Sequence, residues 1–150
     1  MSQPFPEPVL RKLTEEPLWQ EANQLADFFY NLTGSFPDTE QWYSAAKIRS
    51  ACMDMLFYVS EALGSPQPST AETDWSHAAK AVTALRAMYP FTGRQGFTKT
   101  DPDIVLRLDK MLKMIGQEVS IAHKHFTQVN AADLDLWREK YKIWKKIDDK

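Results

Sequence analysis

The sequence is poor in the residues that build disulfides, metal centres and membrane spans. Its 150 residues include one cysteine, Cys52, and three histidines. A lone cysteine excludes an intramolecular disulfide and a thiolate-rich zinc site. No apolar run approaches the roughly 18 residues that a membrane-spanning helix needs, and residues 1–10 lack the charged start and apolar stretch of a signal peptide. We therefore expect a cytoplasmic protein that has no membrane segment, metal or cofactor.

Catalytic residue patterns are equally scarce. Asp74 and His77 have the spacing of a carboxylate–histidine metal pair, but a di-iron bundle needs two such pairs and further carboxylates. His123 and His125 would point about 200° apart on a helix, and we expect them near a helix C-terminus, where a cation meets the dipole. Cys52 falls in an apolar stripe, which favours a buried structural thiol over a nucleophile. The sequence predicts that the protein is not an enzyme.

The composition is typical of a folded domain, and the charge is unevenly distributed along the sequence. Hydrophobic residues make up 43% of the chain and charged residues 25%, as in single soluble domains. The net charge is −2, but the first 75 residues hold four Lys and Arg against eleven Asp and Glu, and the last 75 hold fourteen against nine. Two interpretations are open, namely a polarised surface and charge-complementary packing between helices.

Long proline-free intervals with apolar residues at three- and four-residue steps predict helices. Two stripes are the clearest: Ala45, Ile48, Cys52, Met55, Leu56, Val59, Ala62 and Leu63, then Ile104, Leu108, Met111, Leu112, Ile115, Val119 and Ala122. We expect helices over about 16–33, 39–63, 70–89, 102–124 and 131–147. The fold class is all-α, an antiparallel four-helix bundle with an additional C-terminal helix. The regions are an extended N-terminal arm (1–15), the bundle (16–125) and a C-terminal helical extension (126–150).

Two helix starts carry capping signals. Asp38 could cap the second helix, with Gln41 at the spacing of a capping box. Asp101 followed by Pro102 is a similar start signal for the fourth helix. The segment Phe91–Thr100 holds two glycines and is expected to be an exposed loop.

The segment from Leu18 to Gly64 has a recognisable order of short motifs. These are Leu18-Trp19-Gln20-Glu21-Ala22, Tyr30-Asn31-Leu32-Thr33, Ser35-Phe36-Pro37 with Glu40, Lys47-Ile48-Arg49-Ser50-Ala51 and Val59-Ser60-Glu61-Ala62. The order resembles the four-helix-bundle family of the 23S ribosomal RNA intervening-sequence proteins, which is similar to the accessory variability proteins of diversity-generating retroelements. Four positions depart from the family pattern: Ser50, Cys52, Tyr58 and Ala62.

The resemblance implies a non-enzymatic, ring-forming bundle, commonly a homopentamer. For the retroelement proteins it implies a positively charged accessory that binds nucleic acid and the reverse transcriptase. Ser50 stands where the family has a second arginine, which weakens the implied nucleic-acid binding more than the implied protein binding.

Two basic helical faces lie opposite the apolar stripes and are the predicted surface for nucleic acid or another partner. They comprise Arg107, Lys110, Lys113, Lys124, Arg138, Lys142, Lys145 and Lys146. The alternative is a solvated basic face without a partner. Arg49 follows the core residue Ile48, and we expect it in a structural or interface ion pair rather than on a phosphate.

The chain is rich in aromatic residues, with five Trp, five Tyr and eight Phe. Trp137, Tyr141 and Trp144 form one aromatic face at helical spacing, which favours packing on the bundle or a neighbouring copy over another protein or nucleic acid. Aromatic area in excess of one small core predicts a homo-oligomer. We therefore expect an accessory protein that binds a larger enzyme of the reverse-transcriptase type and its RNA or DNA. The alternative is a helical interaction module or a small structural subunit of a ribonucleoprotein assembly.

Overall fold

The computed structural model describes residues 13–65 and 68–148, with side chains over 13–65 and 70–125. Over these residues it contains two short 3-10 helices, η2 (Leu13–Glu15) and η3 (Asp38–Glu40), and four α-helices, α1 (Pro17–Gly34), α2 (Ser44–Gly64), α3 (Pro68–Arg94) and α4 (Pro102–Asp148). The described chain is all-α, as the periodicity predicts. Of the expected extended arm, residues 1–12 lie outside the described residues, and the last three form η2.

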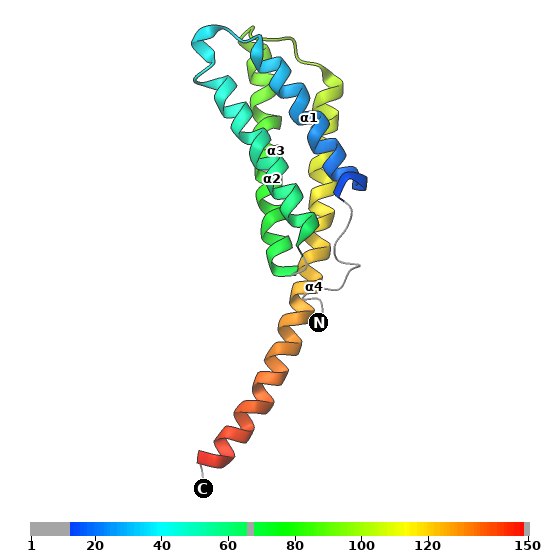
Figure 1. Ribbon diagram of the computed structural model, residues 1–150, viewed down its shortest axis with the longest axis vertical. Coiled ribbons are helices and arrows are strands. Elements are labelled where there is room, and N and C mark those ends of the chain that lie inside the picture. The colour runs from blue at the N-terminus through cyan, green and yellow to red at the C-terminus, as the bar shows by residue number, and fades with distance from the viewer. Residues whose placement is uncertain (1–12, 66–67, 149–150) are drawn as a thin grey trace.

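The apolar stripes predicted from the sequence form the core. α2 packs against α1 and α3, and α3 packs against the first half of α4, so α1, α2, α3 and this part of α4 lie side by side (Figure 1). Leu56, Leu112 and Val119 are only half-buried at the edges of their stripes. The other members of the two predicted stripes are buried: Ala45, Ile48, Cys52, Met55, Val59, Ala62, Leu63, Ile104, Leu108, Met111, Ile115 and Ala122.

α4 differs from the expectation because it is one helix of 47 residues. The expected fourth helix (102–124) and fifth helix (131–147) are joined without a break, and α4 continues well beyond the other three helices (Figure 1). Residues 117–148 contain neither proline nor glycine, so nothing in this stretch stops a helix once it has begun. The predicted location of His123 and His125 at a helix C-terminus is therefore wrong.

The connection between α1 and α2 also differs from the expectation. Asp38 begins the 3-10 helix η3, and α2 starts only at Ser44, without a side-chain cap. The predicted cap by Asp38 is wrong because α2 begins six residues further on. Gln41, the predicted partner in the capping box, makes other contacts. Its side-chain amide donates to the backbone carbonyls of Thr33 (2.9 Å) and Phe36 (3.0 Å). Gln41 thus ties the connection back to the end of α1.

The connection between α3 and α4 is shorter than the predicted loop. α3 runs on across Pro90 to Arg94, although a proline inside a helix removes one backbone donor and crowds the preceding turn. The buried residues Tyr89 and Thr92 hold the helix on both sides of Pro90. Gly96 has a positive φ of 79°, which glycine adopts at little cost. The predicted start of α4 is confirmed, because Oδ1 of Asp101 accepts a hydrogen bond of 2.9 Å from the backbone N–H of Asp103.

Tyr89 anchors this connection to the core. Its ring is fully buried and packs edge-to-face against Phe28 and Phe29, with centroid separations of 5.8 and 5.3 Å. Its hydroxyl oxygen accepts a hydrogen bond of 2.7 Å from the backbone N–H of Asp101. Burial raises the pKa of Tyr89, so the phenol stays protonated.

The variant Tyr89→Phe keeps the aromatic packing and removes the acceptor for the N–H of Asp101. We expect the free energy of unfolding to fall by about 1 kcal/mol, which lowers Tm by about 2–4 °C in a chain of this size. Thermal and urea denaturation measure the change. Tyr43→Phe is the matched control, because Tyr43 is 70% exposed and should tolerate the same loss. Equal stability of the two variants would show that the bond does not hold the connection.

Candidate interaction surfaces

Three of the predicted basic residues lie exposed along the bundle part of α4. Lys110, Lys113 and Lys124 are all exposed, and their spacings of three and eleven residues correspond to about one and three helical turns. They therefore share one face of the helix, opposite the buried residues Leu108 and Met111.

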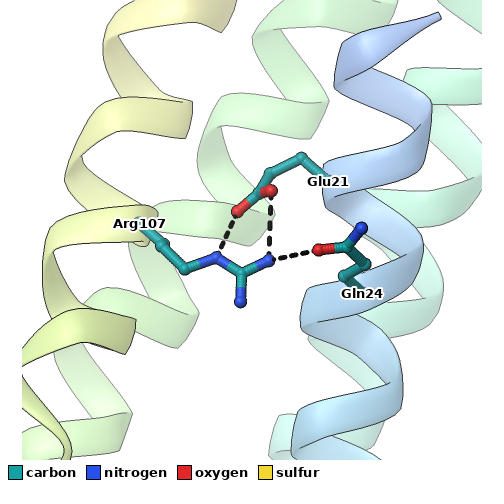
Figure 2. Close-up of polar contacts among 3 residues, drawn as sticks. All are labelled: Glu21, Gln24 and Arg107. Atoms are coloured by element: carbon teal, nitrogen blue, oxygen red, sulfur yellow. Dashed lines mark hydrogen bonds and ion pairs between the residues drawn. The ribbon is translucent and has the colours of Figure 1, made fainter.

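Arg107 differs from these exposed lysines because it forms an ion pair with a carboxylate on α1. Its Nε and one Nη donate to the two oxygens of Glu21 at 2.7 and 3.1 Å, and the same Nη reaches the amide oxygen of Gln24 at 2.8 Å (Figure 2). The hydrogen bond to Glu21 raises the pKa of Arg107. A bidentate arginine–carboxylate pair fixes direction as well as charge. Arg107 thus connects α4 to α1, and its charge is directed within the chain.

Arg49 also makes contacts inside the bundle, but its partner is not a carboxylate. Its Nε donates to the hydroxyl oxygen of the buried Thr33 at 3.0 Å, and its guanidinium lies 5.8 Å from the centre of the Tyr30 ring. Thr33 donates in turn to the carbonyl of Phe29 at 2.8 Å. These contacts give Arg49 a structural role between α1 and α2, through a hydroxyl and a ring. The expected ion pair at an interface between copies stays a prediction.

The remaining predicted site residues belong to the part of α4 beyond the bundle. Their backbone is helical, but their side chains lie outside the described residues. They are Arg138, Lys142, Lys145, Lys146, Trp137, Tyr141 and Trp144.

Two polar contacts between helices join the acidic first half of the chain to the basic second half, whereas the pair of Arg86 and Asp109, at 2.8 Å, lies within the second half. Glu21 pairs with Arg107, and Glu72 on α3 lies 2.9 Å from Nδ1 of His123 on α4. Both acidic partners come from the first 75 residues. The uneven distribution of charge along the sequence is therefore used in part for packing between helices.

An exposed apolar surface lies on α2 and was not predicted from the sequence. Met53 and Phe57 are 54% and 60% exposed, and together with Leu56, Ser60 and Glu61 they line a shallow, open depression. We call these five residues together with the exposed Asp54 the α2 face. The sequence does contain a pattern that indicates this surface. Met53 and Phe57 are two large apolar residues four apart, on the side of the helix away from the buried stripe.

Further aromatic residues are exposed just before α2. Trp42 and Tyr43 are 86% and 70% exposed. An exposed tryptophan is unusual, because its large apolar ring is normally buried in a core or an interface. Together with the α2 face, they place much of the exposed aromatic area on and next to one helix.

A buried carboxyl group lies between α2 and α3. Asp74 is only 5% exposed, and its Oδ2 has no hydrogen-bond partner among the described residues. Burial raises the pKa of Asp74, the negative charge of Glu61 adds to this, and His77 opposes it. His77 stacks on the Tyr58 ring with a centroid separation of 4.8 Å. Within the described residues, no group of three or more His, Cys, Asp or Glu side chains could hold a metal ion.

Cys52 is a buried structural thiol, as predicted. It is fully buried in α2, and this burial raises its pKa to about 12. A thiol with this pKa carries almost no nucleophilic thiolate near neutral pH.

No protein-family model matches this chain, and no curated protein matches its sequence. Among the described residues, no helix is both long and apolar enough to cross a membrane.

The variant Arg107→Ala tests the connection between α1 and α4. Because the paired side chains are 35% and 27% exposed, solvent screens the pair, and we expect a loss of about 1 kcal/mol in the free energy of unfolding. Lys110→Ala, on the same helix but exposed, should change stability by less than about 0.5 kcal/mol. Urea denaturation of both variants measures the difference. If Arg107→Ala were as stable as Lys110→Ala, the guanidinium would contribute nothing to holding the two helices together.

Proposed function

We propose that this chain is a non-enzymatic, oligomeric accessory protein of the cytoplasm that binds a larger enzyme of the reverse-transcriptase type, together with its RNA or DNA. The observation that carries the proposal is the exposure of Trp42, Tyr43, Met53 and Phe57 on and next to one helix. Large apolar side chains grouped at a surface are typical of protein interfaces. The class of enzyme and a ring of five copies rest on the resemblance of residues 18–64 to the intervening-sequence and accessory variability proteins. The antiparallel order of the bundle rests on the short connections between the helices.

The nucleic-acid part of the proposal depends on α4. Lys110, Lys113 and Lys124 present three positive charges along one exposed face, and lysines in such a row neutralise phosphates without reading bases. Arg107 contributes less than the sequence suggested, because its Nε and one of its two Nη groups already donate to Glu21 and Gln24.

The engagement of Arg107 also favours the second candidate function. A helical protein-interaction module, or a small structural subunit of a ribonucleoprotein assembly, would use the apolar surface of α2 and need less positive charge. The two functions differ in whether the exposed lysines of α4 matter for binding.

Light scattering tests the oligomeric part of the proposal. We expect a multimer, with the resemblance favouring a mass about five times 17.3 kDa, because burial of the exposed aromatic area favours association. Measurements at concentrations on the order of tens of micromolar are appropriate for an assembly held by such an interface. A monodisperse monomer under these conditions would contradict a ring.

Reversing the exposed lysines of α4 tests the nucleic-acid part. The variant Lys110→Glu/Lys113→Glu/Lys124→Glu should bind single-stranded RNA more weakly, and its slope of log affinity against log salt should be shallower by about 2, at about 0.7 per lost contact. Lys47→Glu/Lys80→Glu/Lys99→Glu is the matched control, with the same charge change at exposed lysines elsewhere. Unchanged RNA binding in the α4 variant, or equal weakening in both, would leave the α4 lysines without a specific role and favour the protein-interaction module.

A further inference from the structure

The α2 face is the outward side of a helix that is otherwise enclosed. α1 and α3 both pack on α2, and its buried residues, such as Ile48, Met55 and Val59, point toward them. Met53 and Phe57 point away from this core and are more than half exposed. Within the described part of the chain, no helix is packed against this side of α2.

α4 carries the chain away from its own bundle. Ala122 is the last buried residue of α4 among those whose side chains are described, and the helix continues to Asp148. At 1.5 Å per residue, the extension over residues 126–148 is about 33 Å long, and it projects from one end of the bundle (Figure 1). Because the helix is continuous, the extension reaches its own α2 face only if the helix breaks. A second copy presents the same face with no such requirement.

The sequence of the extension is complementary to the α2 face in spacing. Trp137, Tyr141 and Trp144 follow each other at steps of four and three residues. On α2, Met53 and Phe57 are four residues apart, and Ser60 follows after three. Two helices that each carry large apolar residues four apart can pack along one another, as an amphipathic helix does on an apolar groove. The third position on α2 is the small polar residue Ser60.

The two surfaces are also complementary in charge. Asp54 and Glu61 are exposed beside the apolar residues of the α2 face, and residues 50–65 contain no lysine or arginine. The extension carries Arg138, Lys142 and Lys145 beside its aromatic residues. Opposite charges around an apolar contact select the partner and its orientation. The whole extension also holds Asp133, Asp135, Glu139 and Asp148, but its aromatic part, residues 137–146, has five Lys and Arg against one Glu. Two extensions packed on each other through this part would bring like charges together, so charge favours the α2 face as the docking site.

We propose that the extension of α4 (126–148) of one copy docks on the α2 face of a second copy, with Trp137, Tyr141 and Trp144 against Met53 and Phe57. The inference rests on the homo-oligomer of the proposed function and assigns the contact that forms it. In this arrangement each copy gives one extension and receives one, so the same contact can repeat around a closed assembly.

Charge exchange in the full-length chain tests the contact. The first variant, Asp54→Lys/Glu61→Lys, makes the α2 face basic, and the second, Lys142→Glu/Lys145→Glu, makes the extension acidic. We expect each variant alone to associate at least about tenfold more weakly than the natural chain, because like charges then face one another. Analytical ultracentrifugation measures the association. The control Asp27→Lys/Asp38→Lys changes the same charge at exposed residues away from the α2 face and should associate normally.

Mixing the two variants distinguishes contact between copies from contact within one copy. In an equimolar mixture, the basic α2 face meets the acidic extension, and the natural face of the second variant meets the natural extension of the first. We expect the mixture to associate at least about tenfold more tightly than either variant alone, and to form even-numbered assemblies, because the two variants attract each other only when they alternate. A chain that carries all four substitutions is compared with the mixture. If association returned in this chain but not in the mixture, the extension would contact the α2 face of its own copy, and the proposal would be overturned.

Photo-crosslinking locates the contact directly. A photoreactive residue at position 57, which is 60% exposed, is placed in chains of normal isotopic composition and mixed with nitrogen-15-labelled chains. We expect crosslinked peptides from 131–147 of the labelled chain. Crosslinks to α2 of the other copy, or to 131–147 of the same chain, would contradict the proposal. A multimer without these crosslinks would remove this contact but leave the proposed function standing, whereas a monomer would remove the homo-oligomer as well.

Discussion

The structure depends on the burial of one side of α2. Ile48, Cys52, Met55 and Val59 are fully buried, and burying each of the larger side chains is worth about 1.5–3 kcal/mol relative to leaving it in water. Because α1 and α3 both pack on α2, the helix has one side left open. The α2 face is the direct result of this enclosure, and its apolar residues are available for another chain.

Polar contacts then determine how the outer helices sit on this core. Arg107 connects α4 to α1 through Glu21, Arg49 connects α2 to α1 through Thr33, and Tyr89 holds the backbone at the start of α4. Each contact joins groups that are at least partly shielded from water, where a lost hydrogen-bond partner is costly. Two of the arginines that could serve a partner are thereby used in the bundle, which leaves lysines as the exposed cations of the bundle part of α4.

Much of the fold could be read from local patterns. The stripes around Ile48 and Leu108 predict helices with the correct buried residues, because a period of 3.6 residues is visible within a few turns. Asp101 with Pro102 predicts the start of α4 for the same local reason. The division of α4 at residues 124–131 failed, because a polar stretch without proline or glycine looks like a connection in sequence but is compatible with a helix. The α2 face was missed because exposure depends on which helices pack alongside α2.

The sequence by itself determined the all-α class, most core residues of α2 and of the bundle part of α4, and the inert character of Cys52, since all three follow from the spacing of apolar residues along short segments. Only the tertiary structure decided what the charged residues do. Glu21 and Arg107 are 86 residues apart, and no local pattern relates them. Whether an arginine faces solvent or a carboxylate depends on which helices become neighbours, and that is decided when the apolar stripes pack together.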